Sequence, residues 1–322
     1  MTARRPAAHP PSHPSAAPPL ARLTGAGKRY GRVTALAAID LEVRAGEVLA
    51  VLGANGAGKS TALGLLTGRL GPDQGRAELF GRDPREPASR RGIGVMLQEA
   101  TLPETLRVAE LVRLFSGYYP APRALPETLE LAGLQSLASR RFDALSGGEK
   151  RRLQFALALC GNAPLLFIDE PSVGLDVEAR RHMWQVLRAL RDAGTTLVLT
   201  THHLEEADAL ADRIVVLAEG RVLATDTAAG IKALAAGKRV RCRTSLPAAR
   251  IAQWPEVDAV GAEGDRLELR TGRAEALLRR LLAADAGLAD LEVLQLGLED
   301  AFIALTAATS RANGGPSREQ AA

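Results

Sequence analysis

The sequence contains few cysteines and few aromatic residues. Of its 322 residues only Cys160 and Cys242 are cysteines, and both lie in apolar or strand-like segments. Two unrelated buried thiols are favoured over a disulfide or a metal site, which suits a reducing cytoplasm. Aromatic residues make up 3 % of the chain, so we do not expect a base-stacking platform for single-stranded nucleic acid.

Long hydrophobic runs and blocks of like charge are also missing. The longest uncharged run covers residues 153–168, and its Gly-Asn-Ala-Pro segment, 161–164, divides it into a helix end and a strand. It is therefore not expected to span a bilayer. Arg4 and Arg5 are followed by no apolar segment, so no secretory signal is expected. The net charge of +4 is spread along the chain and favours neither nucleic acid nor lipid. Any membrane role would be that of a peripheral subunit.

The composition is that of a globular protein with an atypical N-terminus. Hydrophobic residues make up 46 % and charged residues 24 % of the chain, which is ordinary for a soluble protein. The length allows one large domain and a small one. Residues 1–20 are mostly Pro, Ala, Ser and His. Because such a segment cannot form a core, we expect a disordered tail there.

A glycine-rich segment lies between an apolar run, 47–52, and an expected helix start, 61–66. It fits G-x-x-x-x-G-K-[ST], the phosphate-binding loop. The loop consists of Gly53, Ala54, Asn55, Gly56, Ala57, Gly58, Lys59, Ser60 and Thr61. Its glycines let main-chain N–H groups converge on an anion, and the helix N-terminus adds its positive dipole end. Lys59 supplies a cation for the β- and γ-phosphates and Ser60 a hydroxyl for Mg²⁺. We therefore expect the chain to bind a nucleoside triphosphate.

Two later segments can take part in the same chemistry. Ser146, Gly147 and Gly148 open an expected helix, and such an N-terminus either binds a second anion or only caps the helix. The apolar run 165–168 predicts a buried strand whose carboxyl end presents Asp169 and Glu170. In this context an aspartate can hold Mg²⁺, and a glutamate can accept a proton from an attacking water.

Three further residues remain open when each is considered alone. Tyr30 in an expected turn is suited to packing or to stacking on a purine. Gln98 ends an expected strand, where it either contacts solvent or touches a metal ion or a water. His202 follows the expected strand 195–201, and a histidine there is structural or catalytic.

The pattern of elements predicts two folded domains. Residues 21–234 read as an α/β domain with a helical insertion at about 103–160. Residues 235–308 read as a small α+β domain whose last helix covers 298–305, and 309–322 as a loose tail.

The phosphate loop, Gln98, the Leu-Ser-Gly-Gly-Glu segment 145–149, the Asp-Glu pair and His202 follow one another in this order. In this combination the chain resembles the ATP-binding subunits of ABC transporters over residues 21–232. The resemblance implies an α/β fold, namely a P-loop NTPase ABC ATPase domain with a helical subdomain. Glu149 and Val173 depart from the commoner residues of the family, at positions that do not carry the chemistry.

The resemblance implies a role for each of these residues. The implied nucleotide-binding residues are Tyr30, which stacks on adenine, the loop from Gly53 to Thr61, and Ser146, Gly147 and Gly148, which bind the γ-phosphate of a nucleotide held by the other subunit. The implied Mg²⁺ ligands are Ser60, Gln98 and Asp169. The implied catalytic residues are the general base Glu170, His202 at the γ-phosphate, and Gln98, which also faces the transmembrane partner. Residues 172–176 are implied to join the two sites.

The C-terminal segment 297–306 and the segment 98–106 resemble the drug- and polysaccharide-exporting (ABC-2 type) branch. This resemblance implies an ATP hydrolase, with ATP and Mg²⁺ as cofactors, that powers a separately encoded transmembrane permease. The implied cargo is a drug, a lipid or a polysaccharide-like substrate. A homodimer in the ATP-bound state and a cytoplasmic position, peripheral on the inner face of the cell membrane, are also implied.

The alternative is a soluble ABC ATPase that acts on ribosomes or nucleic acid. Translation-type members usually carry two cassettes in one chain, and DNA-repair members split the cassette with a long coiled coil. This chain has one cassette, and too few residues separate the phosphate loop from segment 145–149 for a coiled coil. A nucleic-acid partner is therefore not expected.

Overall fold

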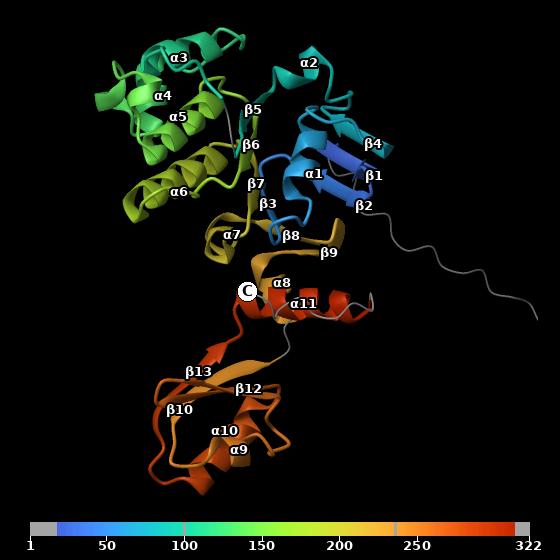
Figure 1. Cartoon of the computed structure of the whole chain (residues 1–322), viewed down its shortest axis with the longest axis vertical. Helices are drawn as coiled ribbons and strands as arrows, with labels where there is room; N and C mark the ends of the chain where they lie inside the picture. Colours follow the sequence, from blue (N-terminus) through green and yellow to red (C-terminus); the bar gives the residue numbers. More distant parts are fainter. Residues whose placement is uncertain (1–17, 99–100, 235–236, 313–322) are drawn as a thin grey trace, which may run out of the picture.

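The computed structural model describes residues 18–98, 101–234 and 237–312. Most of the expected N-terminal tail and residues 313–322 lie outside these ranges. Figure 1 shows a larger upper body and a smaller lower body, with helix α11 (Leu298–Ala312) between them. Leu20, which we expected in the tail, belongs to the larger body, because its N–H donates to Val43 O (2.8 Å) and extends the strand ladder. In the described ranges no helix is long and apolar enough to cross a membrane.

A six-stranded sheet in the order β5-β6-β7-β3-β8-β9 forms the centre of the larger body. Its strands are β3 (Val48–Leu52), β5 (Ile93–Met96), β6 (Leu165–Asp169), β7 (Thr196–Thr201), β8 (Arg213–Ala218) and β9 (Arg221–Asp226). All neighbouring strands are parallel except β8 and β9. Strands β3, β6 and β7 are buried along their whole length, as continuous apolar runs predict for parallel strands covered on both faces. Their carboxyl ends meet at one edge, where α/β sheets place ligands.

A three-stranded antiparallel sheet covers one side of this core. Its order is β2-β1-β4, with β1 (Ala21–Tyr30), β2 (Val33–Val43) and β4 (Gln74–Leu79). Helix α1 (Lys59–Leu66) lies between the two sheets, since Leu66 shares an apolar cluster with Leu23 of β1 and Phe167 of β6. The short helix α2 (Pro87–Arg90) leads to β5. The phosphate loop is therefore fixed by packing on both of its sides.

Helices cover the other side of the central sheet (Figure 1). They are α3 (Val108–Ser116), α4 (Leu125–Leu131), the 3₁₀ turns η1 (Gln135–Leu137) and η2 (Phe142–Ala144), α5 (Gly147–Leu159) and α6 (Val177–Asp192). Leu111 of α3 and Phe155 of α5 belong to one apolar cluster that also contains Ile168 of β6. The helical subdomain therefore packs on strand β6 of the central sheet.

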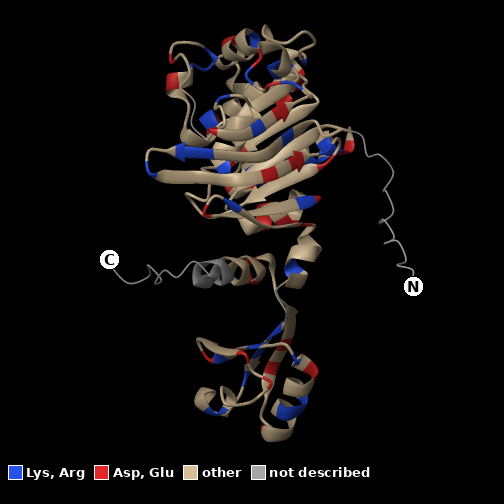
Figure 2. Ribbon diagram, turned by 90° about the vertical axis from the view of Figure 1, so that its right-hand side faces the viewer, with Lys and Arg blue, Asp and Glu red and all other residues tan. Residues whose placement is uncertain are grey.

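The smaller body has the order of elements β-α-β-β-α-β. Its elements are β10 (Lys238–Arg243), α9 (Ala248–Ile251), β11 (Ala259–Glu263), β12 (Arg266–Thr271), α10 (Ala274–Ala284) and β13 (Ala289–Gln295). The antiparallel sheet has the order β11-β12-β10-β13, which is the ferredoxin-like arrangement. Basic and acidic residues both lie on this body (Figure 2), and Arg239 and Arg241 both pair with Glu268.

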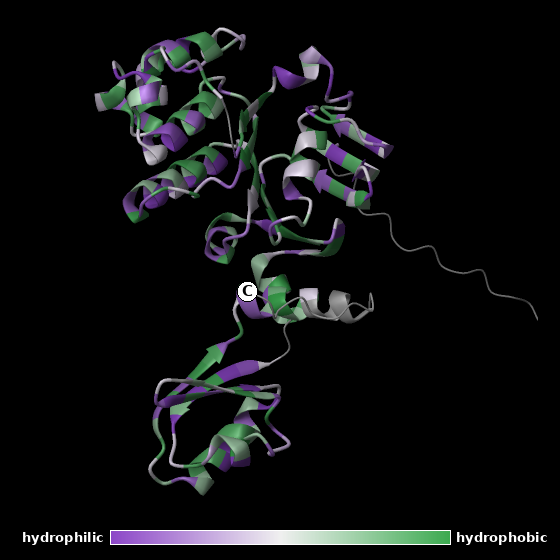
Figure 3. Ribbon diagram, in the orientation of Figure 1, coloured by the Kyte–Doolittle hydropathy of each residue, from purple (hydrophilic) through white to green (hydrophobic). Residues whose placement is uncertain are grey.

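Helix α11 differs from the helix that we expected within the accessory domain. It continues beyond Leu305 to Ala312, into the segment expected as a loose tail, and it packs on α7 (Leu204–Leu210) and α8 (Ala228–Leu234) of the larger body. Leu298 and Ala301 are buried there with Ile231, and Figure 3 shows the hydrophobic residues of α8 beside α11. The helices α9 and α10 already cover the small sheet, so the apolar face of α11 is buried on the larger body instead.

Candidate active site

The phosphate loop connects β3 to α1 in a conformation that requires glycine. Gly56 and Gly58 have φ values of 81° and 106°, in the left-handed region that other residues avoid. A Cβ on Gly58 would meet the Ala35 carbonyl oxygen at 2.5 Å, and one on Gly53 would meet that of Leu217 at 2.4 Å. Gly58 is also the N-cap of α1 and has no side chain to cap the first N–H groups. These donors therefore suit an anion.

Lys59 is buried inside the loop that it belongs to, with only 6 % of its surface exposed. Its Nζ donates to Gly53 O (2.8 Å) and Ala54 O (3.3 Å) and lies 3.1 Å from Glu170 Oε1. The ammonium is therefore held between the phosphate loop and the end of β6.

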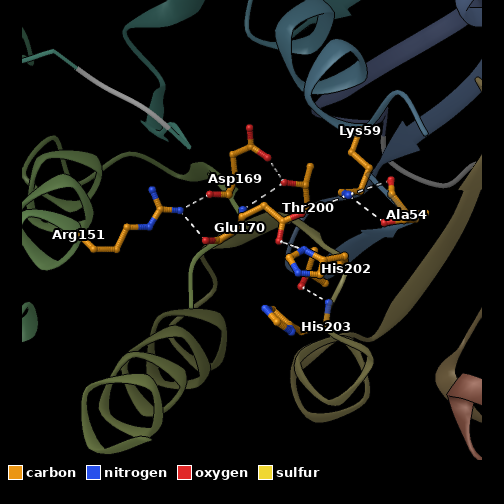
Figure 4. A network of polar contacts seen from close by, with 10 residues as sticks. Ala54, Lys59, Arg151, Asp169, Glu170, Thr200, His202 and His203 are labelled. Atoms are coloured by element: carbon orange, nitrogen blue, oxygen red, sulfur yellow. Dashed lines mark hydrogen bonds and ion pairs between the residues drawn. The ribbon is translucent and has the colours of Figure 1, made fainter. Parts of the chain in front are cut away.

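Glu170 adopts an unusual backbone conformation at the end of β6. Its φ is 52°, and a non-glycine residue in this region costs about 1–2 kcal/mol. Its N–H donates to Thr200 O (2.9 Å), and its carboxylate Oε2 lies 2.7 Å from His202 Nδ1. Only 4 % of Glu170 is exposed. The strained backbone aims a buried carboxylate at both Lys59 and His202 (Figure 4).

Asp169 points away from that group although it is the neighbouring residue. Its Oδ1 accepts a hydrogen bond from Thr200 Oγ1, and the side chain is buried. Figure 4 shows its carboxylate on the opposite side of the strand end from His202. The two adjacent carboxylates thus have separate surroundings, which suits two different roles.

A cavity of about 460 Å³ opens at these strand ends. It is lined by Tyr30, Val33, Thr34, Ala35, Ala54, Asn55, Gly56, Gly58, Lys59, Ser60, Thr61, Gln98 and Glu170. Tyr30 is the last residue of β1 rather than part of a turn, and 49 % of it is exposed. The structure therefore brings together an exposed aromatic ring, the phosphate loop, Gln98 and Glu170, as the resemblance implied.

His202 lies beside this cavity, in contact with Glu170, and its ring is 4.0 Å from that of His203. His203 donates its main-chain N–H to Thr201 Oγ1 (2.9 Å) and precedes helix α7. Of the two adjacent histidines, His202 is thus the one in contact with the Glu170 carboxylate.

Ser146, Gly147 and Gly148 are not brought to the same cavity. Among the described residues its lining contains none of the three. Ser146 caps α5: its hydroxyl accepts from Glu149 N (3.3 Å), and its own N–H donates to Glu149 Oε2 (2.7 Å). The hydrogen bond from the Ser146 main chain is the main reason that the pKa of Glu149 is lowered. This second glycine-rich helix start is a separate site on the surface.

Sequence reasoning missed Thr200 and Arg151. Thr200 contacts both acidic residues from the neighbouring strand β7. Arg151 reaches the strand ends from α5, and its guanidinium donates to the carbonyls of Asp169 and Glu170. The sequence signal for Arg151 was weak: it lies one helical turn before the buried Phe155, next to the polar Gln154 on the same face of α5.

The residues present fit a hard divalent cation. The Ser60 hydroxyl and the Gln98 amide line the cavity, and the Asp169 carboxylate lies at the end of β6. Hydroxyl, amide and carboxylate oxygens are the ligands that Mg²⁺ prefers, together with substrate phosphates. In the described part of the chain no group of three or more His, Cys, Asp or Glu residues could hold a metal ion. Mg²⁺ usually takes one or two protein carboxylates and completes its shell with waters and substrate phosphates.

Comparisons with known proteins agree with this geometry. A family model described as ABC transporter matches residues 36–173. The chain is 40 % identical to the daunorubicin resistance ATP-binding protein DrrA3 of Streptomyces coeruleorubidus, over 88 % of this chain and 94 % of that protein. It is 38 % identical to the Nod factor export ATP-binding protein I of Ralstonia nicotianae, over 67 % of this chain and 69 % of that protein.

Solved structures show the same fold. An ATP-binding subunit of an ABC transporter superposes with a TM-score of 0.62 and 28 % identity, over 66 % of this chain and 92 % of that one. A dimeric ATP-binding cassette bound to ADP and Pi superposes with a TM-score of 0.60 and 27 % identity, over 64 % of this chain and 98 % of that one. The chain therefore belongs to the ABC transporter family, as one of its ATP-binding and ATP-hydrolysing subunits.

Proposed function

We propose that this chain hydrolyses ATP in the 460 Å³ cavity to power export by a separately encoded permease. The observation that carries this proposal is the buried carboxylate of Glu170, held between Lys59 and His202 at the carboxyl ends of the central strands. A carboxylate fixed at the edge of a phosphate-binding cavity is suited to take the proton of a water that attacks the γ-phosphate.

Each cavity residue has a role in this proposal. Lys59 and the N–H groups of the phosphate loop hold the β- and γ-phosphates, and Tyr30 stacks on the adenine ring. His202 contacts the γ-phosphate and positions Glu170, while Gln98 orients the water. Ser60, Gln98 and Asp169 would hold Mg²⁺, which neutralises charge on the phosphates when bound. Removal of Mg²⁺ with a chelator should abolish hydrolysis.

The separate position of the Ser146 helix start supports a shared active site. Two anion-binding helix N-termini in one chain, only one of them at the cavity, are explained if a second copy supplies the other. We therefore propose a C₂ homodimer in which Ser146, Gly147 and Gly148 of one chain close over the nucleotide of its partner. A related cassette is dimeric with ADP and Pi bound.

The relatives' names support an exporting permease as the further partner. One is a daunorubicin resistance protein and another a Nod factor export protein, so we propose a drug, lipid or polysaccharide-like cargo. The ATPase would then be held on the cytoplasmic face of the membrane by its permease. Nothing in the cavity favours a nucleic-acid partner.

Co-expression with a candidate permease tests this function. The candidate is a neighbouring reading frame with about six apolar spans of roughly 20 residues each. In inside-out vesicles, uptake of a fluorescent amphipathic drug should require ATP, the permease and this chain, and Glu170→Gln should abolish it. Hydrolysis by the purified chain without any permease-dependent transport would support the ATPase but contradict the export proposal.

A further inference from the structure

Arg151 is a buried arginine to which the proposed catalytic roles assign nothing. It lies on α5, and only 7 % of it is exposed. Its Nη1 donates to the carbonyls of Leu97 (2.7 Å) and Gln98 (3.1 Å). Its Nη2 donates to the carbonyls of Asp169 and Glu170. One guanidinium therefore joins the main chain of the Gln98 segment to that of the catalytic strand end.

This contact lies where the two strands part. The parallel pairing of β5 with β6 ends at Met96 opposite Ile168. Beyond that point the carbonyls of both segments turn toward Arg151, and Figure 4 shows its guanidinium beside those of Asp169 and Glu170. Because a guanidinium is a rigid planar fork of donors, a single side chain can hold both strand ends at a fixed separation.

The contact with Arg151 is one of those that hold the backbone of Glu170. Its φ of 52° is unfavourable for a residue with a side chain. The N–H of Glu170 donates to Thr200 O, and its carbonyl accepts from Arg151 Nη2 and, over a longer distance of 3.3 Å, from the Val173 N–H. Loss of the contact with Arg151 would let Glu170 relax toward ordinary backbone, and its carboxylate would then swing away from Lys59 and His202.

Packing alone does not account for this arginine. The acceptors of its Nη atoms are main-chain carbonyls and the Gln154 amide (2.8 Å). Its Nε is buried with no hydrogen-bond partner among the described residues, and burial lowers the pKa of the guanidinium. A buried charge costs free energy unless hydrogen bonds offset its desolvation, so burial of this side chain gives no stability by itself. The contribution that an apolar residue could not make is the set of hydrogen bonds to the main-chain carbonyls of residues 97, 98, 169 and 170.

We propose that Arg151 is a positioning residue for ATP hydrolysis, which fixes the Glu170 carboxylate and the Gln98 segment relative to α5. Because Ser146 caps the N-terminus of α5, the helix that faces the partner's nucleotide is tied to the catalytic base of its own chain. The inference rests on the proposed roles of Glu170 and Gln98. It adds a residue that connects the Ser146 helix start, which contacts one nucleotide of the dimer, to the Glu170 carboxylate, which acts on the other nucleotide.

Three variants of the full-length chain test this role in a steady-state ATPase assay. Arg151→Ala should lower kcat by about 10²-fold, the size of effect that a 1 Å misplacement has, with little change in KM for ATP because the phosphate loop is untouched. Arg151→Lys keeps the charge and the aliphatic chain but lacks the planar guanidinium. It should therefore also lower kcat with little change in KM for ATP. Arg152→Ala is the matched control, because Arg152 of the same helix donates to Gly133 O (2.6 Å) in the helical subdomain.

Chemical rescue separates positioning from a structural role. Millimolar guanidinium chloride, far below denaturing concentrations, should restore part of the kcat of Arg151→Ala and none of that of Arg151→Lys, whose side chain fills the pocket. If Arg151→Ala does not fold, the kcat and KM of Arg151→Lys decide alone. Wild-type kcat in Arg151→Lys, or a parallel loss in Arg152→Ala with no guanidinium rescue, would overturn the inference. A wild-type chain that does not hydrolyse ATP would instead contradict the proposed function.

Discussion

Lys59 and Glu170 form a buried ion pair, with 3.1 Å between the ammonium Nζ and the carboxylate Oε1. The second carboxylate oxygen lies 2.7 Å from His202 Nδ1. The three residues come from the start of α1, the end of β6 and the end of β7, so one carboxylate connects the phosphate loop to two strand ends. A change of charge at Glu170 therefore alters the surroundings of both neighbours.

Replacement of this carboxylate should separate binding from turnover. Glu170→Gln keeps the shape of the side chain but cannot accept a proton, so ATP hydrolysis should fall by about 10²–10⁴-fold. ATP binding should persist, because Lys59 keeps its contacts in the phosphate loop. Steady-state hydrolysis and titration with a fluorescent ATP analogue measure the two effects. Glu178→Gln, on an exposed helix position, is the control, and near-normal hydrolysis by Glu170→Gln would refute the general-base role.

Loss of the Lys59 ammonium should affect both nucleotide binding and ATP hydrolysis. Lys59→Ala removes the positive charge that faces the β- and γ-phosphates, so binding of the fluorescent analogue and hydrolysis should both be lost. Lys232→Ala is a suitable control, because Lys232 forms a surface pair with Asp208 and such pairs contribute about 0–1 kcal/mol. Unchanged nucleotide affinity in Lys59→Ala would show that the loop is not the site.

Complementation tests the shared active site. Ser146→Arg should block nucleotide contact at the N-terminus of α5, and Lys59→Ala removes the cation of the phosphate loop. Neither homodimer therefore has a complete active site. In a mixture, the intact Lys59 of one chain faces the intact Ser146 of the other, and one site per heterodimer should be restored. With Glu170→Gln added to both chains, size-exclusion chromatography should show an ATP-dependent dimer only in the mixture. No more dimer in the mixture than in either variant alone would contradict a site formed by two chains.

Glu206 should make stability depend on pH. It is fully buried on α7, and burial raises its pKa above the ordinary 4.5, despite the hydrogen bond from Trp184 Nε1 (3.1 Å). The folded state favours the neutral acid, whereas the unfolded chain ionises at the lower value. Stability from this group is therefore complete below pH 4.5 and declines as the pH rises to the folded-state pKa.

Glu206→Gln should lack this decline, because the amide stays neutral and its oxygen can still accept from Trp184. The Tm of the variant relative to wild type should therefore increase between about pH 4 and about pH 8. Glu205→Gln, an exposed neighbour on the same helix, serves as the control. A constant difference in Tm across this range would show that Glu206 is ionised in the folded protein.

Local motifs predicted most of the cavity. The loop from Gly53 to Thr61, Asp169 and Glu170 are recognisable because the chemistry needs those residue types next to a strand end. Their mutual placement also follows, since the carboxyl ends of parallel strands meet at one edge. The strands β3, β6 and β7 were predicted within one residue of their bounds, because each contains a short apolar run.

The features that were missed depend on contacts between distant segments. Arg151 is important because β5 and β6 part next to it, and no pattern near residue 151 encodes that separation. Tyr30 was assigned to a turn because of its neighbours, whereas β1 extends through it by pairing with Val33. The length and position of α11 likewise depend on which surface is left uncovered by the rest of the chain.

The return of α11 to the larger body makes the small domain an insertion rather than an appendage. Lys238 at its entrance and Gln295 at its exit are paired on β10 and β13, so their Cα atoms are about 5 Å apart. A short glycine-serine link across this neck would excise the whole domain and leave α11 seated on α8. A stop codon after Leu234 would instead remove α11 together with the small domain. It would expose Ile231 and the apolar surface around it to water. The small domain is therefore an exchangeable module, which can be replaced by another whose termini meet in the same way.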